Sequence, residues 1–490
     1  MQVKKFITFI IMIIILVLFS GCELRQTFSE EPGDVNPSLD KQIKLIDGGP
    51  SEGGTLTLFT TPVDTLNPYM TKNRYVTHIA FFLYESLFIQ SDENSVKPWL
   101  VSDWSHEDYL TWNFIINEDV FFHHGQELTA YDIRHTLRVL ENSGSSFYYA
   151  DIFQNIEEIN IIKSTQFEIK LKEPDSTFIK KLVFPILSQT MEAGDAVFIS
   201  GTGPYRFESM DDSTIMLVRN EKWWYGHPPY LDTVQFRVYQ ENEMLDAFQN
   251  NEIDIAFIKN VDFSKYQYRT DIYYQVYPDN KVNFLYVNPG SLFGNSNRQE
   301  YLFRYVAYRI RDMNLGQVQY FEEYNESPMD IEQFMDALIK SGLSWNKDRK
   351  LFTENNKAIS KVSILVSKQE MQKIHTANFL VNILEDAGIQ AQIITASVQN
   401  VQRALRNGTY DLSPVSDELR PWELLDDTLK RMQNELGYGR ERSYIFPLYR
   451  SQQAILFKNR IRGEKNSIFW NPYQNFYTWY MSVYVDEDLK

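Results

Sequence analysis

Short runs of alternating apolar and polar residues recur along the chain after residue 54. Examples are TLTLF at residues 55–59 and VQFRVY at residues 234–239, and a period of two is typical of half-buried β-strands. Other segments carry apolar residues at helical spacing, as in HTANFLVNILED at residues 375–386, which is followed by AGIQAQIIT as turn and strand. Phe379, Ile383 and Leu384 fall on one face of that expected helix. The alternation of strands and helices predicts an α/β fold.

The N-terminus has a different pattern. Residues 1–21 contain two lysines and then an apolar run from Phe6 to Phe19, which is too short for a membrane span and predicts an export signal peptide. The run ends in LFSGC, and Cys22 is the only cysteine of the chain. This resembles the lipobox of bacterial lipoproteins, with Phe19 in place of the usual Leu. We expect Cys22 to carry acyl chains such as palmitate and to anchor the protein on the extracytoplasmic side of the cell membrane; an incidental thiol is the alternative.

Residues 22–54 are polar, rich in Pro, Gly and Ser, and show no sustained apolar period. We expect them to form a flexible tether between the lipid and the folded body. The full chain carries a formal charge of -17, which falls to -19 when the signal peptide is removed with Lys4 and Lys5. So acidic a protein lacks the positive surface that binds phosphate groups, and no nucleic-acid partner is expected.

Three of the seven histidines lie in DVFFHHGQELTAYDIRHTL, residues 119–137. We expect His123 and His124 in a strand, where neighbouring side chains point to opposite faces and do not hold one metal ion together. Thr129 is expected to begin a helix that carries His135 on its solvent side. A structural role is therefore favoured over a metal site or a catalytic site, and no metal or other cofactor is expected.

The same stretch resembles the signature V-x-F-H-x-G, a spacer and L-T-A-x-D-I of the family 5 extracytoplasmic solute-binding proteins, which bind oligopeptides and dipeptides. His124 stands where the family usually has Asp, so the turn lacks a carboxylate there. The matching residues are Val120, Phe122, His123, Gly125, Leu128, Thr129, Ala130, Asp132 and Ile133.

The resemblance continues in order along the chain. The segments before the signature are DTLNPY (64–69), YESLF (84–88), PWLVSDW (98–104) and TWNFII (111–116). Those after it are GTGPYRF (201–207), RNEKWW (219–224), YLDTVQF (230–236) and NEIDIAFI (251–258). The second half agrees less well, through FRYVAYRIRD (303–312), YDL (410–412) and YIFPLY (444–449). The segments after Asp312 and Trp422 are shorter than is usual in the family.

The resemblance implies a two-lobe α/β fold like that of periplasmic binding proteins, class II and of the large type with an extra subdomain in the first lobe. A hinge joins the lobes, and the ligand is enclosed between them. The expected domains are a signal peptide at 1–21, a lipidated tether at 22–54, a first lobe at 55–281 with 445–490, an extra subdomain within it at about 90–195, and a second lobe at 282–444.

Ligand contacts are implied in both lobes. In the first lobe, Lys72, Asn73 and Arg74 follow LNPYMT and match a contact stretch of the family; a solvated loop is the alternative. The aromatic content of 15% fits a cleft lined by rings, and it fits a large core equally well.

In the second lobe, peptide-binding relatives place a W-x-x-D segment whose carboxylate pairs with the α-amine of the ligand. The run LSPVSDELRPWELL, residues 412–425, lacks that motif. Without a gap, Arg420 takes the place of the acid and would suit a carboxylate or phosphate, whereas a three-residue slip restores Asp417, which would select an amine. We favour Asp417, because loops absorb length changes more readily than binding chemistry changes sign. Trp422 of this run is a further expected contact; a surface loop that touches no ligand is the alternative.

The expected function is that of an extracytoplasmic substrate-binding lipoprotein. It would capture a small solute, with a peptide as the favoured class, and deliver it to the permease and ATPase subunits of an ABC importer. A ligand sensor or interaction protein on the same scaffold, with a reduced second lobe, is the alternative. No nucleophile, base and acid converge in the motifs, so the chain is not expected to be an enzyme. A monomer is expected.

Overall fold

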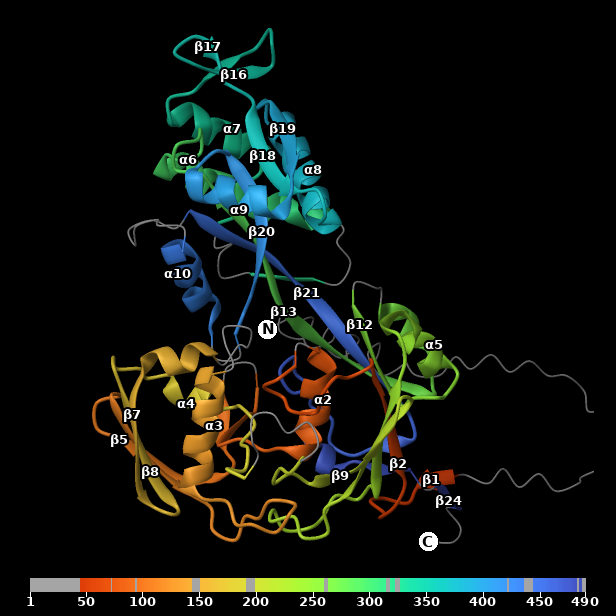
Figure 1. The fold of residues 1–490 in the computed structure, drawn as a ribbon. Helices are drawn as coiled ribbons and strands as arrows, with labels where there is room; N and C mark the ends of the chain where they lie inside the picture. Colours follow the sequence, from red (N-terminus) through yellow and green to blue (C-terminus); the bar gives the residue numbers. More distant parts are fainter. Residues whose placement is uncertain are drawn as a thin grey trace, which may run out of the picture. The chain divides into compact units, whose positions relative to one another are not determined.

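A computed structural model describes residues 45–71, 73–92, 95–142, 150–190, 199–259, 263–313, 318–321, 327–420, 423–435, 444–482 and 484–486. Strands and helices alternate in these ranges, as the sequence predicts, and the strands form one seven-stranded sheet, two four-stranded sheets and several smaller ones (Figure 1). The chain from Asp47 to Val483 forms one compact unit. The short strands β1 (Leu45–Asp47) and β24 (Tyr484–Asp486) pair with each other, so a paired strand is present near the end of the expected tether.

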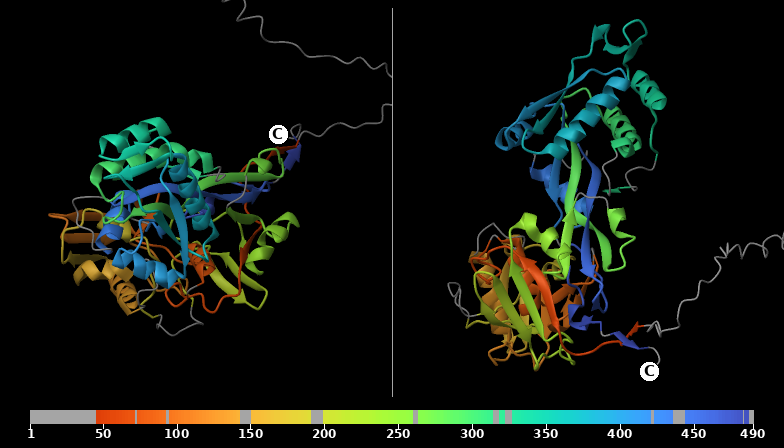
Figure 2. Two further views of the ribbon diagram at one scale, coloured as in Figure 1. Left: turned by 90° about the horizontal axis from the view of Figure 1, so that it is seen from above. Right: turned by 90° about the vertical axis from the view of Figure 1, so that its right-hand side faces the viewer.

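Two long strands, β13 (Ile272–Val287) and β21 (Ile445–Lys458), form the centre of the seven-stranded sheet. They are antiparallel neighbours, with an irregularity between Pro278 and Val282. Figures 1 and 2 show them side by side in green and blue. The sheet is completed by β12 (Ile255–Lys259), β14 (Val318–Tyr320), β18 (Val362–Ser367), β19 (Ala391–Ala396) and β20 (Leu412–Glu418).

The two long strands contribute to separate hydrophobic cores. Ile272 of β13 and Leu456 of β21 pack in one core with residues of helix α5 (Met244–Gln249). Leu285 and Phe446, further along the same strands, pack in another core. That second core includes residues of α6 (Ser296–Arg309), α7 (Ile331–Lys340) and α8 (Met371–Asp386). One strand pair therefore serves two α/β regions; the lobe boundaries given above remain a proposal.

The burial of the helix α8 agrees with the predicted pattern, whereas the strand at residues 55–60 has five consecutive buried residues instead of the expected alternation. In α8, the buried residues include Phe379, Ile383 and Leu384, which form the face expected from the sequence. This face packs against β18 and β19, and four consecutive residues of β18, Ile364 to Ser367, are buried because helices cover it. The strand β6 (Thr111–Ile116) alternates instead, with every second residue buried.

The first four-stranded sheet contains the two strands predicted from TLTLF and VQFRVY. They are β2 (Thr55–Thr60) and β11 (Thr233–Val238), which are parallel neighbours. The sheet continues with β10 (Thr214–Arg219) and β9 (Tyr205–Met210), and β9 contacts helix α2 (Arg74–Leu83).

The second four-stranded sheet is antiparallel and lies within the range 90–195 proposed as the extra subdomain. Its order is β5 (Val101–His106), β6, β8 (Gln166–Leu171) and β7 (Ile156–Lys163). Helices α3 (Ala130–Asn142) and α4 (Phe178–Lys181) belong to the same stretch. One core, which runs from Leu56 to Trp479, includes residues of both four-stranded sheets, so the two sheets are joined by common packing.

The histidine stretch differs from expectation in one respect: His123 and His124 lie in a turn and not in a strand. Gly125, at a φ of 90°, donates its N–H to Phe122 O at 2.8 Å, which closes the turn. His123 Nδ1 accepts from Gly201 N at 3.2 Å, and its Nε2 lies 2.9 Å from Gly203 O.

The histidine contacts fix the loop 200–203 against the turn. Burial lowers the pKa of His123 to about 4, so the ring is neutral at physiological pH. His124 Nδ1 lies 2.7 Å from Ser200 Oγ, and His135 is half-buried on α3. Among the described residues, no three His, Cys, Asp or Glu side chains are arranged to hold a metal ion.

Asp132 is the acidic residue of the signature, and its hydrogen bonds show what the carboxylate does there. It is fully buried at the third position of α3, and its Oδ2 accepts from Thr129 N at 2.8 Å and from Thr129 Oγ1 at 2.7 Å. Its Oδ1 accepts from Gln189 N at 2.7 Å. The carboxylate thus completes the start of the helix, as predicted, and also holds a distant loop.

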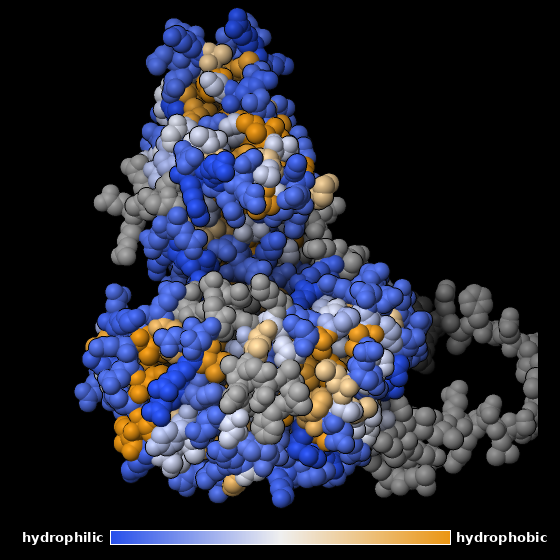
Figure 3. Space-filling model, in the orientation of Figure 1, coloured by the Kyte–Doolittle hydropathy of each residue, from blue (hydrophilic) through white to orange (hydrophobic). Residues whose placement is uncertain are grey.

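Hydrophilic residues cover most of the face drawn in Figure 3, with hydrophobic residues scattered between them. Scattered apolar residues are normal on a protein surface. Among the described helices, none combines the length and the apolar composition that crossing a bilayer requires.

Candidate functional site

A cavity of about 860 Å³ is lined by segments that are far apart in the sequence. They include the loop and helix between Pro68 and Glu85, the end of β20, helix α10 (Leu425–Glu435) and residues 470–477. The volume lies in the range of small-molecule sites. The charged residues in its wall are Arg74, Glu85, Asp417, Glu418, Arg420 and Arg431, and the aromatic ones are Tyr69, Phe81, Tyr84, Trp99, Trp223, Trp470, Tyr473, Phe476 and Tyr477.

Four of the residues expected from the sequence line this cavity. Asn73 and Arg74 come from the segment that begins α2, and Asp417 and Arg420 come from the end of β20 and the loop that follows. Lys72, Trp422 and Cys22 lie outside the described residues. The folding of the chain therefore brings the two expected contact stretches to one cavity.

Asn73 is the N-cap of α2. Its Oδ1 accepts from Tyr75 N at 3.0 Å, and its Nδ2 donates to Thr61 Oγ1 at 3.0 Å and to Pro62 O at 2.9 Å. The amide group thus satisfies an N–H of the first helical turn and fixes the helix to the loop that precedes it.

Arg74 is compensated by neighbouring groups. It forms an ion pair with Glu241, and its Nη2 donates to Tyr75 Oη at 2.9 Å. Both members of the ion pair are more than half exposed. Because solvent weakens such a pair, a ligand carboxylate can compete with Glu241 at modest cost.

The end of β20 carries a denser charge network. Asp417 Oδ2 accepts from Arg431 Nη1 at 2.9 Å, and Arg431 Nε donates to Glu423 Oε1 at 3.0 Å. Arg420 Nε lies 3.6 Å from the same Glu423 oxygen. The carboxylate of Asp417 already has a cationic partner, so an amine of the ligand would have to share it with Arg431.

A second, polar cavity of about 630 Å³ shares two residues with the first, Arg420 and Arg431. It adds Lys172 and Lys181 to its wall, with Glu173 as the acidic residue. Basic residues outnumber acidic ones in this wall, but Lys181 is paired with Asp175 and Arg431 with Asp417, so part of the positive charge is already compensated.

Glu85 belongs to the YESLF segment and lines the cavity, although it is not among the contacts expected from the sequence. Its side chain is buried, and its Oε1 accepts from Trp99 Nε1 at 2.8 Å and from Trp223 Nε1 at 3.1 Å. Its Oε2 accepts from Trp224 Nε1 at 2.8 Å. Burial raises the pKa of Glu85 to about 7, although the indole hydrogen bonds oppose the rise.

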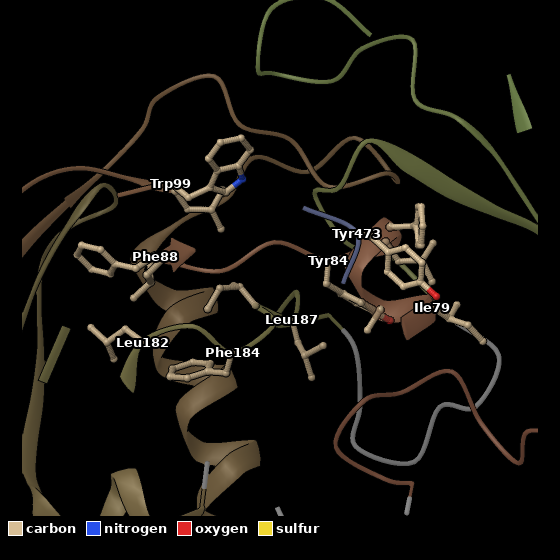
Figure 4. Packing of buried hydrophobic residues seen from close by; sticks show 14 of the residues in the cluster. Ile79, Tyr84, Phe88, Trp99, Leu182, Phe184, Leu187 and Tyr473 are labelled. Carbon is tan, nitrogen blue, oxygen red and sulfur yellow. The ribbon is translucent and has the colours of Figure 1, made fainter. Parts of the chain in front are cut away.

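Two further polar atoms in the cavity wall are buried without a hydrogen-bond partner among the described residues. They are Tyr84 Oη and Gln474 Oε1. The amide nitrogen of Gln474 donates to Gln90 O at 3.2 Å and to Ser91 O at 3.1 Å. Figure 4 shows Tyr473, the neighbour of Gln474, beside helix α2 with Tyr84 and Ile79. Buried polar atoms of this kind are expected to bond to water or to a ligand.

Glu85 and its three tryptophan partners all lie in motifs of the family resemblance, but these motifs are far apart along the chain. Glu85, Trp99 and the pair Trp223–Trp224 lie in YESLF, PWLVSDW and RNEKWW, three separate segments of the family resemblance. An acidic residue and three indole donors in separate motifs do not reveal a common contact until the chain folds.

Residues 95–309 match the family model described as bacterial extracellular solute-binding proteins, family 5, middle region. This region belongs to family 5. The match confirms the resemblance predicted from the signature. Family 5 members are binding proteins of transport systems and not enzymes, in agreement with the sequence-based prediction.

Curated relatives of this family 5 region have different ligands in their names. The nickel-binding periplasmic protein of Escherichia coli is 27% identical over 216 residues, which cover 41% of this chain and 40% of the relative. The glutathione-binding protein GsiB of Salmonella typhimurium is 27% identical over 203 residues, or 39% of this chain and 40% of the relative. The chain thus matches less than half the length of these relatives.

Solved structures resemble the fold over most of its length. NikA from Brucella suis in complex with Fe(III)-EDTA has a TM-score of 0.66 at 15% identity, and covers 88% of this chain and 100% of that one. The oligopeptide-binding protein AppA from Bacillus subtilis in complex with a nonapeptide has a TM-score of 0.55 at 16% identity, with 89% and 100% covered. The predicted two-lobe α/β fold is confirmed.

Proposed function

We propose that this family 5 protein is the substrate-binding component of an ABC importer and that it holds a small solute in the main cavity. The observation that carries the proposal is the cavity of about 860 Å³ lined by rings, buried polar atoms and both expected contact stretches. A concave site of this size with a few polar groups that fix orientation is the usual form of a solute-binding site.

A short peptide is the favoured solute. The cavity contains carboxylates and guanidinium groups that suit the two charged ends of a peptide, and its rings can cover varied side chains. We keep Asn73, Arg74, Asp417 and Arg420 as proposed contacts, together with Lys72 and Trp422. Because Asp417 is paired with Arg431 and lies near Arg420, this end of the cavity suits a carboxylate at least as well as an amine.

The function is tested by blocking the cavity. Thr77 is exposed on α2 and lines the cavity, so Thr77→Trp is expected to fill it and to lower solute affinity at least about tenfold. Gln372→Trp, at an exposed position of α8, is the matched control. Solute extracted from protein purified from its own host is identified by mass spectrometry, and its binding is measured by calorimetry. Equal affinity in both variants, or normal solute uptake by cells that lack the gene, would refute the proposal.

Lipid anchoring at Cys22 is part of the proposed function. A diacylated cysteine holds a protein stably at a membrane, because each buried methylene contributes about 0.8 kcal/mol. Cys22→Ser is therefore expected to move the protein from the membrane fraction to the soluble extracytoplasmic fraction. Fractionation with immunoblotting measures this, and a Cys22→Ser protein that stays with the membrane would contradict anchoring through this residue.

A further inference from the structure

We propose that Glu85 and the side chains around it form a subsite for a positively charged nitrogen of the ligand, either an ammonium or a guanidinium group. The inference rests on the proposed function, because it assigns one part of the solute to one wall of the main cavity. The Glu85 carboxylate would be a charged contact in addition to residues 72–74 and 417–422, which are the stretches expected from the sequence.

Glu85 lacks a counter-ion among the described residues. Glu85 is 7% exposed in the cavity wall, and no Lys, Arg or His of the described residues pairs with it. Its indole partners are neutral donors. A buried carboxylate requires a cation or several hydrogen-bond donors; in the same cavity, the partly buried carboxylate of Asp417 is paired with Arg431. A cationic group of the solute would supply the partner that Glu85 lacks.

The cavity wall beside Glu85 has unused hydrogen-bonding capacity. Tyr84 is 4% exposed and Gln474 is 6% exposed, and the hydroxyl of one and the amide oxygen of the other have no partner among the described residues. Both atoms can accept hydrogen bonds, and the amide nitrogen of Gln474 is already used. An ammonium group has three donors and a guanidinium group has five, so either can satisfy several acceptors at once.

Aromatic rings cluster around Glu85. The centroid of Tyr477 lies 6.0 Å from that of Trp99 and 5.3 Å from that of Trp223, the two indoles that share Glu85 Oε1. Ring faces attract cations, more so where water is excluded. The ring of Trp99 already has one cation above it, since Lys97 Nζ lies 5.6 Å from its centroid.

The electrostatics of the carboxyl group agree with this geometry. Burial raises the pKa of Glu85 to about 7, while the three indoles and the nearby hydroxyl of Thr202 favour the charged form. A cation placed beside the carboxylate would favour the charged form further, so cation binding and ionisation of Glu85 support each other.

A purely structural role is the competing explanation, since Glu85 also joins three tryptophans from two segments of the chain. Tyr84→Phe separates the two roles, because it removes a hydroxyl that makes no hydrogen bond within the described structure. A structural role predicts unchanged or higher thermal stability and unchanged affinity. The subsite predicts a loss of affinity of roughly threefold to tenfold for cationic probes only.

Glu85→Gln is the main test, with Glu252→Gln as its matched control. Glu252 also accepts a side-chain hydrogen bond, from Tyr239 Oη at 2.7 Å, and it does not line the cavity. The probes are lysyl-alanyl-alanine and norleucyl-alanyl-alanine, each with a free or an acetylated N-terminus, and agmatine, which carries both cationic groups without a peptide bond. Binding to the full-length protein is measured by calorimetry, and unfolding midpoints show whether each variant is folded.

We expect Glu85→Gln to weaken binding of the cationic probes roughly ten- to hundredfold and to leave the acetylated norleucyl peptide unchanged. Acetylation and the norleucine replacement identify whether the α-amine or the lysine side chain is bound. If the wild type binds peptides but neither ligand charge nor Glu85→Gln alters affinity, the subsite is wrong and the proposed function stands. If it binds agmatine but no peptide, the subsite stands and the peptide class is wrong. If it binds none of these probes, the subsite is wrong, and the proposed function is decided separately by the solute extracted from the host.

Discussion

Replacing Gly201 by alanine is expected to lower the free energy of unfolding by about 3 kcal/mol or more, the upper end of the cost of overpacking. A Cβ at this position would lie 1.9 Å from the carbonyl oxygen of Leu83 and 2.9 Å from Cδ1 of Tyr84. The oxygen belongs to the backbone at the end of α2, so it cannot rotate away as a side chain can. Either the helix end or the loop 200–203 must move.

Urea unfolding followed by circular dichroism measures this loss. Gly290→Ala is the matched control, because a Cβ there meets only Asn288 side-chain atoms, at 3.7 Å and beyond, and its effect is expected to stay within about 0.5 kcal/mol. Equal stability of the Gly201→Ala and Gly290→Ala proteins would show that the loop does not pack against Leu83 as described. Because Glu85 follows Leu83 closely, the Gly201→Ala protein is also expected to bind solute more weakly.

The Asp254→Ala protein is expected to be about 3 kcal/mol less stable than the wild type. The side chain of Asp254 is fully buried; its Oδ2 accepts from Thr57 N at 2.8 Å, and its Oδ1 accepts from Arg460 Nε at 2.5 Å. Its backbone N–H donates to Thr57 O, and its carbonyl accepts from Lys458 N. The residue thus connects β2 with the end of β21, and its removal leaves a buried N–H without an acceptor.

We place this loss at the low end of the range for buried charge pairs, because the side chain of Arg460 is 52% exposed and regains water when the aspartate is removed. Asp254→Asn keeps the shape and is expected to recover part of the loss, while Asp212→Ala at an exposed position is expected to be neutral. Urea unfolding of the three variants provides the comparison. An Asp254→Ala protein as stable as the Asp212→Ala protein would contradict the role given to this carboxylate.

These positions also show what the family motifs do in this chain. His123, Asp132, Gly201 and Asp254 all belong to segments of the resemblance, and each one holds backbone segments together. These four positions of the family motifs are therefore explained by stability. Other residues of the motifs, among them Tyr69, Glu85 and Trp99, line the cavity.

Much of the fold could be predicted from the sequence because it depends on local pattern. The helix at 371–386 and the strands β2 and β11 follow from apolar periods that can be read within a few residues. The turn at His123 and His124 was not predicted, since a strand was expected there. The segment is a turn because Gly125 takes a left-handed conformation. The family resemblance added the two-lobe arrangement and the two contact stretches that meet at the cavity.

The sequence by itself determined the elements, the family of the middle region and the candidates Asn73, Arg74, Asp417 and Arg420. Only the tertiary structure decided their partners. Arg431 pairs with Asp417 because α10 folds back onto the end of β20, and no local pattern specifies that direction. The same holds for Glu85, whose tryptophan partners lie up to 139 residues away in the chain. The period of apolar side chains indicates which face of an element is buried. Contacts between polar groups that are distant in the sequence depend instead on the packing of the whole chain.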